Sequence, residues 1–395
     1  MKISFKRIFY YASFSIYCLY RLLTSSMLGQ NQWFLDLYPV ICFLCIGLVL
    51  VHLMLINRYK KKAFIFYCLT MAIVAIVYLE ANLIFPVVLT FLMLGSKNVS
   101  SKTIAKIYLC LSSIVLLTSG IAANFGLIED RIFYRGDGIP RHSMGMTYVT
   151  IWSGILYFTL AAYIYLRYKK ITVWELIAIL ALSYEAYVLS GTRLELLLMI
   201  VLLAFLIAYK INDGVVPNII KLFENISLIV SCFVSFALVF LYASNPSKYA
   251  YLNKLFSNRF AYTLAVMQKY AIKPFGQYIR MQGYGTINFD REYGYFFVDS
   301  FYINYSLVYG WVLMAIFIVA FTYIFYKLNE HNQQWIMLFG VIGAIHGIII
   351  SAIVDPCICP FFIIASAEYN ELIMTQKNDS AKLRRKRKTK RIKFK

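Results

Sequence analysis

Arginines beside apolar runs are the residues of this sequence whose chemistry is easiest to name. Arg193 is the sharpest case, because it follows Ser190-Gly191-Thr192 at the junction of two apolar runs. An arginine in the apolar zone of a membrane costs about 2.5 kcal/mol or more unless it is paired or hydrated, and Glu195 or Glu185 is its expected partner. Guanidinium holds phosphate through two parallel hydrogen bonds, so several arginines suit a pyrophosphate. The candidate anion-binding residues are Arg141, Arg193, Arg259 and Arg280, although any one of them could instead snorkel to lipid phosphates.

Three titratable side chains are candidate general bases, in no firm order: Asp299, His346 and Asp355. Asp299 stands at the start of an apolar run, where a carboxylate is commonly only a helix cap. His346 lies inside an apolar run, where a histidine is more often a packing residue than a catalyst. Asp355 directly precedes Pro356. An ionisable residue in a membrane segment is nevertheless a functional hypothesis by default, which keeps all three as candidates.

The elements that must position these residues are membrane helices. The chain has 395 residues, of which 61% are hydrophobic and only 14% are charged. Soluble proteins are about a quarter charged, and a membrane helix needs roughly 20 mostly apolar residues. We therefore predict an all-α polytopic bundle of about twelve transmembrane helices. The predicted spans are 8–28, 34–56, 63–79, 81–96, 105–126, 144–166, 173–190, 194–209, 220–243, 297–326, 335–353 and 357–373.

The distribution of basic residues predicts the orientation. The N-terminus is basic, and so are most of the loops that share its side, which places both termini in the cytoplasm by the positive-inside bias. Residues 1–376 then form the bundle, with extracytoplasmic loops at 127–143 and 244–296. The segment 377–395 holds eleven Lys or Arg and one acid, Asp379. We interpret this segment as a cytoplasmic tail against anionic membrane lipid rather than a nucleic-acid site.

Cysteines and histidines point to no metal site. Six of the eight cysteines lie inside apolar runs, where cysteine behaves as a small buried hydrophobe. Cys357 and Cys359 form a C-x-C pair without further Cys or His at ligand spacing. We therefore predict no metal, no cofactor and no disulfide framework.

Three short motifs resemble the Wzy-type polysaccharide polymerases of bacterial capsule and O-antigen synthesis. Arg141-His142-Ser143-Met144-Gly145-Met146 resembles the R-x-S-L-G-F entry to a membrane helix in that family. Leu189-Ser190-Gly191-Thr192-Arg193 resembles its S-x-x-R element. Asp299-Ser300-Phe301-Tyr302 with Tyr309-Gly310 is similar to its D-N-x-Y and Y-G segment, and Arg259 to Gly276 resembles its long loop. Met144, Met146, Leu194 and Ser300 depart from the usual residues, and a carboxylate common near the C-terminal end of the family has no clear match.

The resemblance implies a GT-C-like membrane glycosyltransferase at the outer face of the bacterial cytoplasmic membrane. Its substrate would be an undecaprenyl-pyrophosphate-linked oligosaccharide, whose growing glycan moves as a block to a new lipid-linked repeat unit. Arg193 and Arg141 would hold the pyrophosphate, with Arg259 and Arg280 as second choices. A chain-length regulator and a flippase are the partners that the family implies. Tyrosines of the long loop could stack on sugars, although tyrosine is ordinary at a membrane interface.

Two other functions use the same features. A glycan ligase would take the same donor but transfer it to a different acceptor. A lipid-linked oligosaccharide flippase or other transporter suits twelve helices, but it would carry its charges in a central cavity across the bilayer. The concentration of arginines at one face favours the polymerase over the transporter.

Overall fold

The computed structural model describes residues 5–56, 61–134, 138–211, 218–331 and 333–376. Within these residues the fold is all-α, apart from one short antiparallel hairpin of β1 (Ile132–Tyr134) and β2 (Pro140–His142). The basic tail predicted at 377–395 lies outside the described residues. The all-α prediction is therefore confirmed for the described part of the chain.

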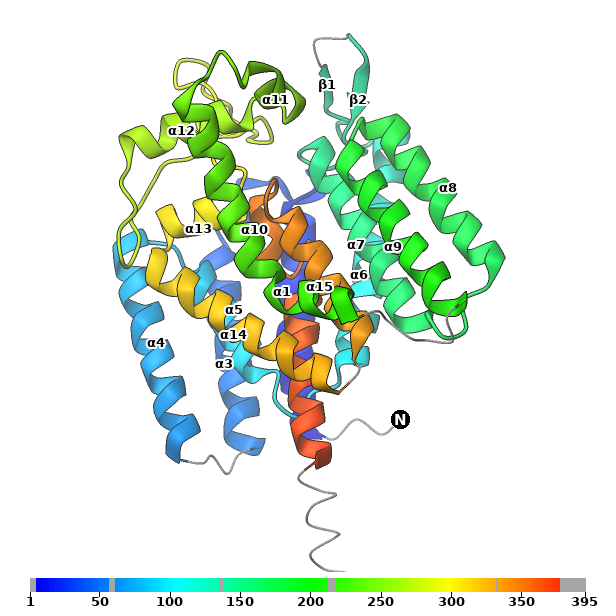
Figure 1. The fold of residues 1–395 in the computed structure, drawn as a ribbon, viewed down its shortest axis with the longest axis vertical. Coiled ribbons are helices and arrows are strands. Elements are labelled where there is room, and N and C mark those ends of the chain that lie inside the picture. Colours follow the sequence, from blue (N-terminus) through cyan, green and yellow to red (C-terminus); the bar gives the residue numbers. More distant parts are fainter. Residues whose placement is uncertain (1–4, 57–60, 135–137, 212–217, 332, 377–395) are drawn as a thin grey trace, which may run out of the picture.

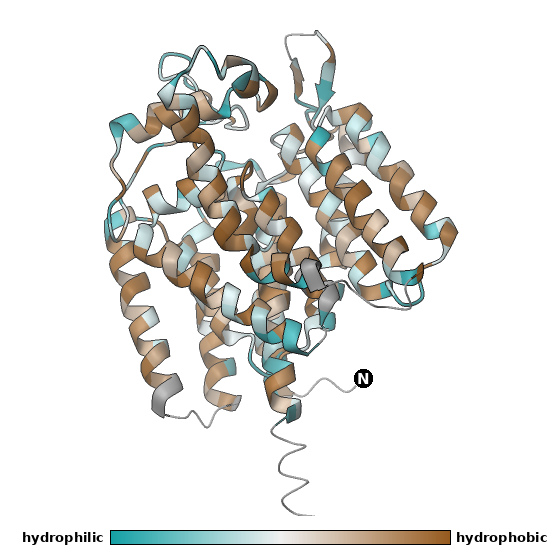
Figure 2. Cartoon of the chain, viewed as in Figure 1, coloured by the Kyte–Doolittle hydropathy of each residue, from teal (hydrophilic) through white to brown (hydrophobic). Residues whose placement is uncertain are grey.

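Apolar helices dominate the molecule (Figures 1 and 2). Among the described residues, eight helices are long and apolar enough to cross a membrane. Hydrophobic side chains also cover the outer surfaces of these helices, as expected for a protein embedded in lipid. These findings support a membrane-embedded protein, whereas the number twelve and the GT-C-like arrangement stay predictions. The longer helices are α1 (Phe5–Thr24), α3 (Tyr38–Ile56), α4 (Lys61–Ala81), α5 (Phe85–Gly95), α6 (Ser101–Asn124), α7 (Val149–Arg167), α8 (Val173–Ser190), α9 (Arg193–Ile211), α10 (Asn218–Ser244), α14 (Trp311–Glu330) and α15 (Gln334–His346).

Helix α1 lies near the centre of the bundle (Figure 1). It packs against α3 and α6 and buries Tyr10, Phe14 and Tyr17 completely. Its last turn carries Arg21, a charged residue in an otherwise largely apolar helix. The Arg21 side chain is 31% exposed, and its guanidinium is directed to the buried Asp355.

The single helix predicted for 297–326 is wrong, because the structure divides it into α13 (Phe301–Val308) and α14. Gly310 stands at the break with a φ of 88°, a conformation that favours glycine. A Cβ at Gly310 would overlap the Pro274 carbonyl oxygen, and a Cβ at Gly276 would overlap that of Val308. The Val312 N–H donates to Pro274 at 3.1 Å. The end of the long loop thus packs directly against the break between α13 and α14.

The helix predicted for 335–353 is also shorter than expected. α15 ends at His346, and a short 3-10 turn follows at Ser351–Val354 before the last helix, residues 361–376. The Phe301 N–H donates to the Gly347 carbonyl oxygen at 2.8 Å, so α13 fills the gap left by the missing helix. Non-helical backbone is tolerated at membrane depth where protein covers it. Segment 347–360 is therefore an irregular stretch held inside the bundle.

The two long loops share one end of the molecule, here called the loop end. It carries the β1–β2 hairpin together with α11 (Ala250–Leu255) and α12 (Arg259–Lys269), as Figure 1 shows. Arg131 joins the two loops, since its guanidinium donates to the carbonyl oxygens of Thr147 at 2.8 Å and Gly285 at 3.2 Å. The side of the membrane that this end faces stays a prediction.

Candidate functional site

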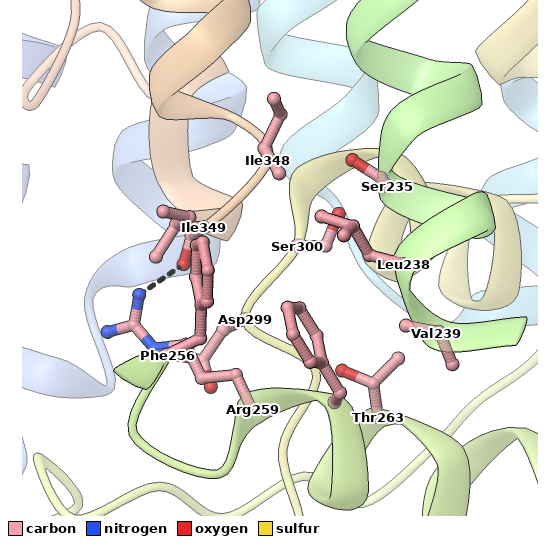
Figure 3. Close-up of a pocket in the computed structure, with 11 residues that line it drawn as sticks. Ser235, Leu238, Val239, Phe256, Arg259, Thr263, Asp299, Ser300, Ile348 and Ile349 are labelled. Atoms are coloured by element: carbon pink, nitrogen blue, oxygen red, sulfur yellow. Dashed lines mark hydrogen bonds and ion pairs between the residues drawn. The ribbon is translucent and has the colours of Figure 1, made fainter. Parts of the chain in front are cut away.

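Arg259 is held at the loop end by the start of α12. Asn253 of α11 accepts the N–H groups of Phe260 and Ala261 with its side-chain oxygen, both at 3.2 Å. These bonds satisfy two of the N–H groups that the first turn of a helix leaves without partners. Arg259 then reaches away from α12, and its Nη1 donates to the Ile349 carbonyl oxygen at 2.8 Å (Figure 3). The guanidinium therefore ties the long loop to the irregular segment 347–360.

Asp299 lies beside Arg259, and both line a small hollow between α10, α12 and the turn that follows α15 (Figure 3). Arg259 Nε lies 3.7 Å from Asp299 Oδ1, and the Tyr295 hydroxyl donates to Asp299 Oδ2 at 2.8 Å. Asp299 precedes Ser300, the N-cap residue of α13, so its carboxylate is directed to these partners rather than to the helix start. Arg259 and Asp299 are the pair of predicted site residues that the structure brings together most directly.

Burial sets the protonation of this carboxyl group. Removal from water raises the pKa of Asp299, and the positive charge of Arg259 and the Tyr295 hydroxyl oppose that rise. Burial is also the largest cause that raises the pKa of Tyr295, so its phenol stays a hydrogen-bond donor. A carboxylate with a raised pKa binds a proton more readily, which is the property that a general base needs.

His346 lies deeper in the bundle and faces Glu195, which the sequence predicts as a partner of Arg193. Its Nε2 is 3.7 Å from Glu195 Oε1, and both side chains are buried. The rings of Tyr157 and Phe158 flank the imidazole, with centroids 5.8 and 5.3 Å away. The charge of Arg259 acts on Glu195 as well. His346 and Glu195 therefore form a buried acid–base pair.

Asp355, the third candidate base, is held in a tight ion pair. Its Oδ2 accepts Nε and Nη2 of Arg21 at 3.0 and 2.7 Å, and its Oδ1 accepts the Cys357 N–H at 3.1 Å. Its side chain is 5% exposed, and the Arg21 guanidinium lies 5.6 Å from the centre of the Tyr38 ring. A carboxylate whose two oxygens are both occupied holds structure better than it accepts a substrate proton.

Arg141 and Gly191 bring the first two motifs of the sequence into contact. Arg141 Nε donates to the Ser190 carbonyl oxygen at 2.6 Å, and the arginine is 7% exposed. Gly191 ends α8 with a φ of 63°, and a Cβ there would come within 2.8 Å of Arg141 Nε. The sequence motifs around 141 and 191 thus form one corner of the loop end.

Arg193 points the other way, contrary to its predicted pairing. Its side chain is exposed, and the described residues contain no ion pair between it and either Glu195 or Glu185. Glu195 faces His346, because positions two apart on a helix point to opposite sides. The predicted partnership of Arg193 with these acids is therefore wrong, and its role in anion binding stays a prediction.

Arg280 lies apart from the hollow. Its Nη2 is 3.4 Å from Asp290 Oδ2, its guanidinium covers the Tyr293 ring at 4.9 Å, and its side chain is 61% exposed. The structure therefore places Arg259, but not Arg280, beside a candidate base.

Three tyrosines of the long loop gather next to Asp299. The Tyr295 ring centroid lies 4.4 Å from that of Tyr262 and 4.7 Å from that of Tyr284. Tyr251 and Tyr278 are exposed at 79% and 60% and stand apart from this group. Among the tyrosines of the long loop, this cluster contacts the candidate base through Tyr295.

Sequence reasoning missed Arg21 and the inward role of Glu195. Arg21 lies in the last turn of an apolar helix, and a charge in such a run is the signal that would have found it. Among the described residues, no group of three or more His, Cys, Asp or Glu side chains is arranged to hold a metal ion. The arrangement offers a cation and a carboxylate at one hollow, which suits transfer of a group from an anionic leaving group.

The chain matches no known family model, no curated protein and no solved structure.

Proposed function

We propose that this protein is a membrane glycosyltransferase that polymerises lipid-linked oligosaccharide repeat units, as Wzy-type polymerases do. The observation that carries the proposal is the contact of Arg259 with Asp299 beside a small hollow at the loop end. A cation that could hold a pyrophosphate stands there beside a carboxylate that could accept a proton. The substrate would be a glycan on undecaprenyl pyrophosphate.

The proposed reaction uses the two side chains in different ways. An acceptor sugar hydroxyl attacks the anomeric carbon of the donor glycan, and the bond from that carbon to the pyrophosphate oxygen breaks. Asp299 takes the hydroxyl proton, and Arg259 stabilises the negative charge that develops on the leaving pyrophosphate. The Arg259 guanidinium is already held by the Ile349 carbonyl oxygen, and Asn253 holds the start of α12, so little reorganisation is needed during the reaction.

The residues around Arg259 and Asp299 support these two separate roles. Tyr295 holds Asp299 from one side, while Tyr262 and Tyr284 place aromatic faces nearby that suit a sugar ring. Arg141, at the corner formed with Ser190, is a second guanidinium near the loop end for the donor. His346, which faces Glu195, is the alternative base.

Deletion of the gene, followed by gel sizing of lipid-linked and surface glycan, tests the proposal. We expect single repeat units without a ladder, restored by the wild-type gene and by Asp36→Asn but not by Asp299→Asn. Asp36 is an exposed aspartate on the chain that follows α1, and so it controls for loss of a carboxylate alone.

Each other outcome identifies a different function. Full-length chains stranded on the carrier lipid would indicate a ligase. Repeat units trapped on the cytoplasmic side would indicate a flippase. An unchanged ladder in the deletion strain would overturn glycan assembly altogether.

A further inference from the structure

One face of α10 carries polar side chains toward the interior of the bundle. Glu224, Ser227, Ser231 and Ser235 follow one another at helical spacing and are exposed by only 1%, 7%, 4% and 3%. This face packs against α14 and α15. We call these four residues the polar seam, and at 1.5 Å per residue it runs for about 16 Å along the helix.

Glu224 is the residue of the seam that packing alone does not explain. Its Oε2 is buried and has no hydrogen-bond partner in the described part of the chain. The charge that acts on it comes from Lys221, one turn earlier on the same helix. An ionised carboxylate without a close partner is strongly disfavoured in such surroundings. Small serines are common where helices pack closely, but a buried carboxyl group is not.

Charged groups on the neighbouring helices are already engaged with one another. On α14, Lys327 pairs with Glu330 at 2.7 Å. On α15, His346 faces Glu195 of α9. On α12, Arg259 faces Asp299. Tyr302 of α13 faces Ser231 with its hydroxyl and donates to the Ala344 carbonyl oxygen. None of these described pairs supplies a counter-ion to Glu224.

The seam leads to the Asp299 hollow. Ser235 and Ser300 line that hollow together with Asp299, as Figure 3 shows. The Ser300 hydroxyl is buried without a hydrogen-bond partner among the described residues, and so is the Thr322 hydroxyl of α14. The hydroxyls of Ser227 and Ser235 donate to backbone carbonyls of Glu224 and Ser231, which leaves their oxygen lone pairs able to accept.

We propose that Glu224 is a proton-binding carboxyl group and that the polar seam carries protons between it and the Asp299 hollow. A proton binds the Glu224 carboxylate and passes along the seam hydroxyls, each of which gives its own proton forward as it receives one. The pathway requires a water molecule in each gap, since side chains one turn apart are about 5–6 Å from each other. The proton ends on the Asp299 carboxylate. One O–H bond breaks for each that forms, and no electrons are transferred.

The protonated carboxyl group can be detected by chemical labelling. Dicyclohexylcarbodiimide reacts with protonated carboxyl groups in apolar surroundings, and the adduct is located by mass spectrometry of the purified protein. We expect an adduct at Glu224 that disappears as the pH rises and is lost in Glu224→Gln. Glu292→Gln, which removes an exposed loop carboxyl group, should leave the adduct unchanged. Failure of Glu224 to react at any pH would overturn the proton-binding assignment.

Proton movement is measured separately in liposomes that contain the purified protein and a trapped pH-sensitive dye. With an imposed pH gradient, we expect proton flux above that of empty liposomes, and loss of the excess in Glu224→Gln. Ser231→Val should also lose it while keeping the carbodiimide adduct, whereas Ser244→Ala, at the exposed end of α10, should retain it. Flux equal to that of empty liposomes, or unchanged in Ser231→Val, would overturn the pathway.

The inference goes beyond glycan polymerisation, and its test uses no glycan. A normal glycan ladder together with no proton flux would overturn only the proposed proton pathway. Proton flux together with a ladder that gene deletion does not change would overturn only the proposed polymerase function.

Discussion

Two arginine–carboxylate pairs in this protein use the same chemical groups in opposite ways. Arg21 places two guanidinium nitrogens on one oxygen of Asp355, at 2.7 and 3.0 Å, and a backbone N–H takes the other oxygen. Arg259 stays 3.7 Å from Asp299 and directs its Nη1 to a backbone carbonyl. Both pairs involve the irregular stretch 347–360. Arg21 and Asp355 are within hydrogen-bond distance, whereas Arg259 and Asp299 are not.

The difference separates a closed ion pair from one that the proposed reaction could use. Asp355 has no unoccupied carboxylate oxygen in the described structure, so a substrate would have to break an ion pair to use it. Asp299 borders a hollow, and its hold on Arg259 is longer than a hydrogen bond. A bound ligand can draw together two side chains that are not hydrogen-bonded in its absence. The comparison therefore favours a stabilising role for Arg21 and is consistent with the role in chemistry proposed for Arg259.

The largest expected effect comes from breaking the closed pair. Arg21→Ala leaves the Asp355 carboxylate buried without its cation, and breaking a buried pair in this way costs about 3–5 kcal/mol. We expect a lower unfolding temperature for the purified protein in detergent, followed by tryptophan fluorescence. The double variant Arg21→Met, Asp355→Leu should recover much of the loss, because it removes both charges.

Lys327→Ala provides the control, since it breaks an exposed pair with Glu330 and should cost less than about 1 kcal/mol. Equal losses in the two single variants would contradict a structural role for the Arg21 pair.

Substitution of Arg259, which pairs with Asp299, should mainly affect activity. Arg259→Lys keeps the charge but loses the planar fork, and loss of one such donor typically costs about 2.7–4 kcal/mol, or roughly 100- to 1,000-fold in rate. We expect that loss in elongation of purified lipid-linked repeat units, with an unfolding temperature that falls much less than in Arg21→Ala. Arg280→Ala removes an exposed arginine of the same loop and should stay close to wild type. A similar rate loss in both variants would refute the assignment of Arg259.

The smallest expected effect concerns pH. The Tyr295 hydroxyl lowers the pKa of Asp299 against the larger effect of burial, so Tyr295→Phe raises that pKa further. A base must be ionised, and activity is lost as the pH falls through its pKa. The acidic limb of the rate profile should therefore move to higher pH by about one unit, the size expected for one hydrogen bond to a charged group.

Tyr293→Phe is the matched control for this shift, because the Tyr293 hydroxyl donates to the Arg280 backbone instead. An unmoved limb in Tyr295→Phe would indicate that Asp299 does not titrate in the reaction, and His346 would then be the next candidate.

Hydropathy was enough to predict the class of fold and most helix positions. Runs such as 173–190 coincide with a helix, since Thr172 and Glu175 form a capping box at its start and Gly191 ends it. The breaks at Gly310 and after His346 could not be predicted in the same way. Both depend on contacts with distant segments, and an apolar run looks the same whether it is one helix or two.

The candidate site was predictable in its residue types but not in its pairings. Asp299 and Arg259 were both selected from the sequence, yet their contact depends on how α12 and the turn after α15 meet. Asp355 was selected as a base, and its Arg21 partner lies 334 positions earlier in the chain. Helical spacing shows which residues share a face, but it does not show which faces meet.

The interlocked glycines 276 and 310 have a consequence for ancestry. Each occupies space that a side chain on the other strand of backbone would need, and each has a positive φ. A side chain at either position therefore fits only if the two backbone segments move apart. Lineages that share this architecture should keep both glycines or lose both, however far the loop between them varies in length. Such paired retention is a mark of descent that survives after overall similarity has eroded.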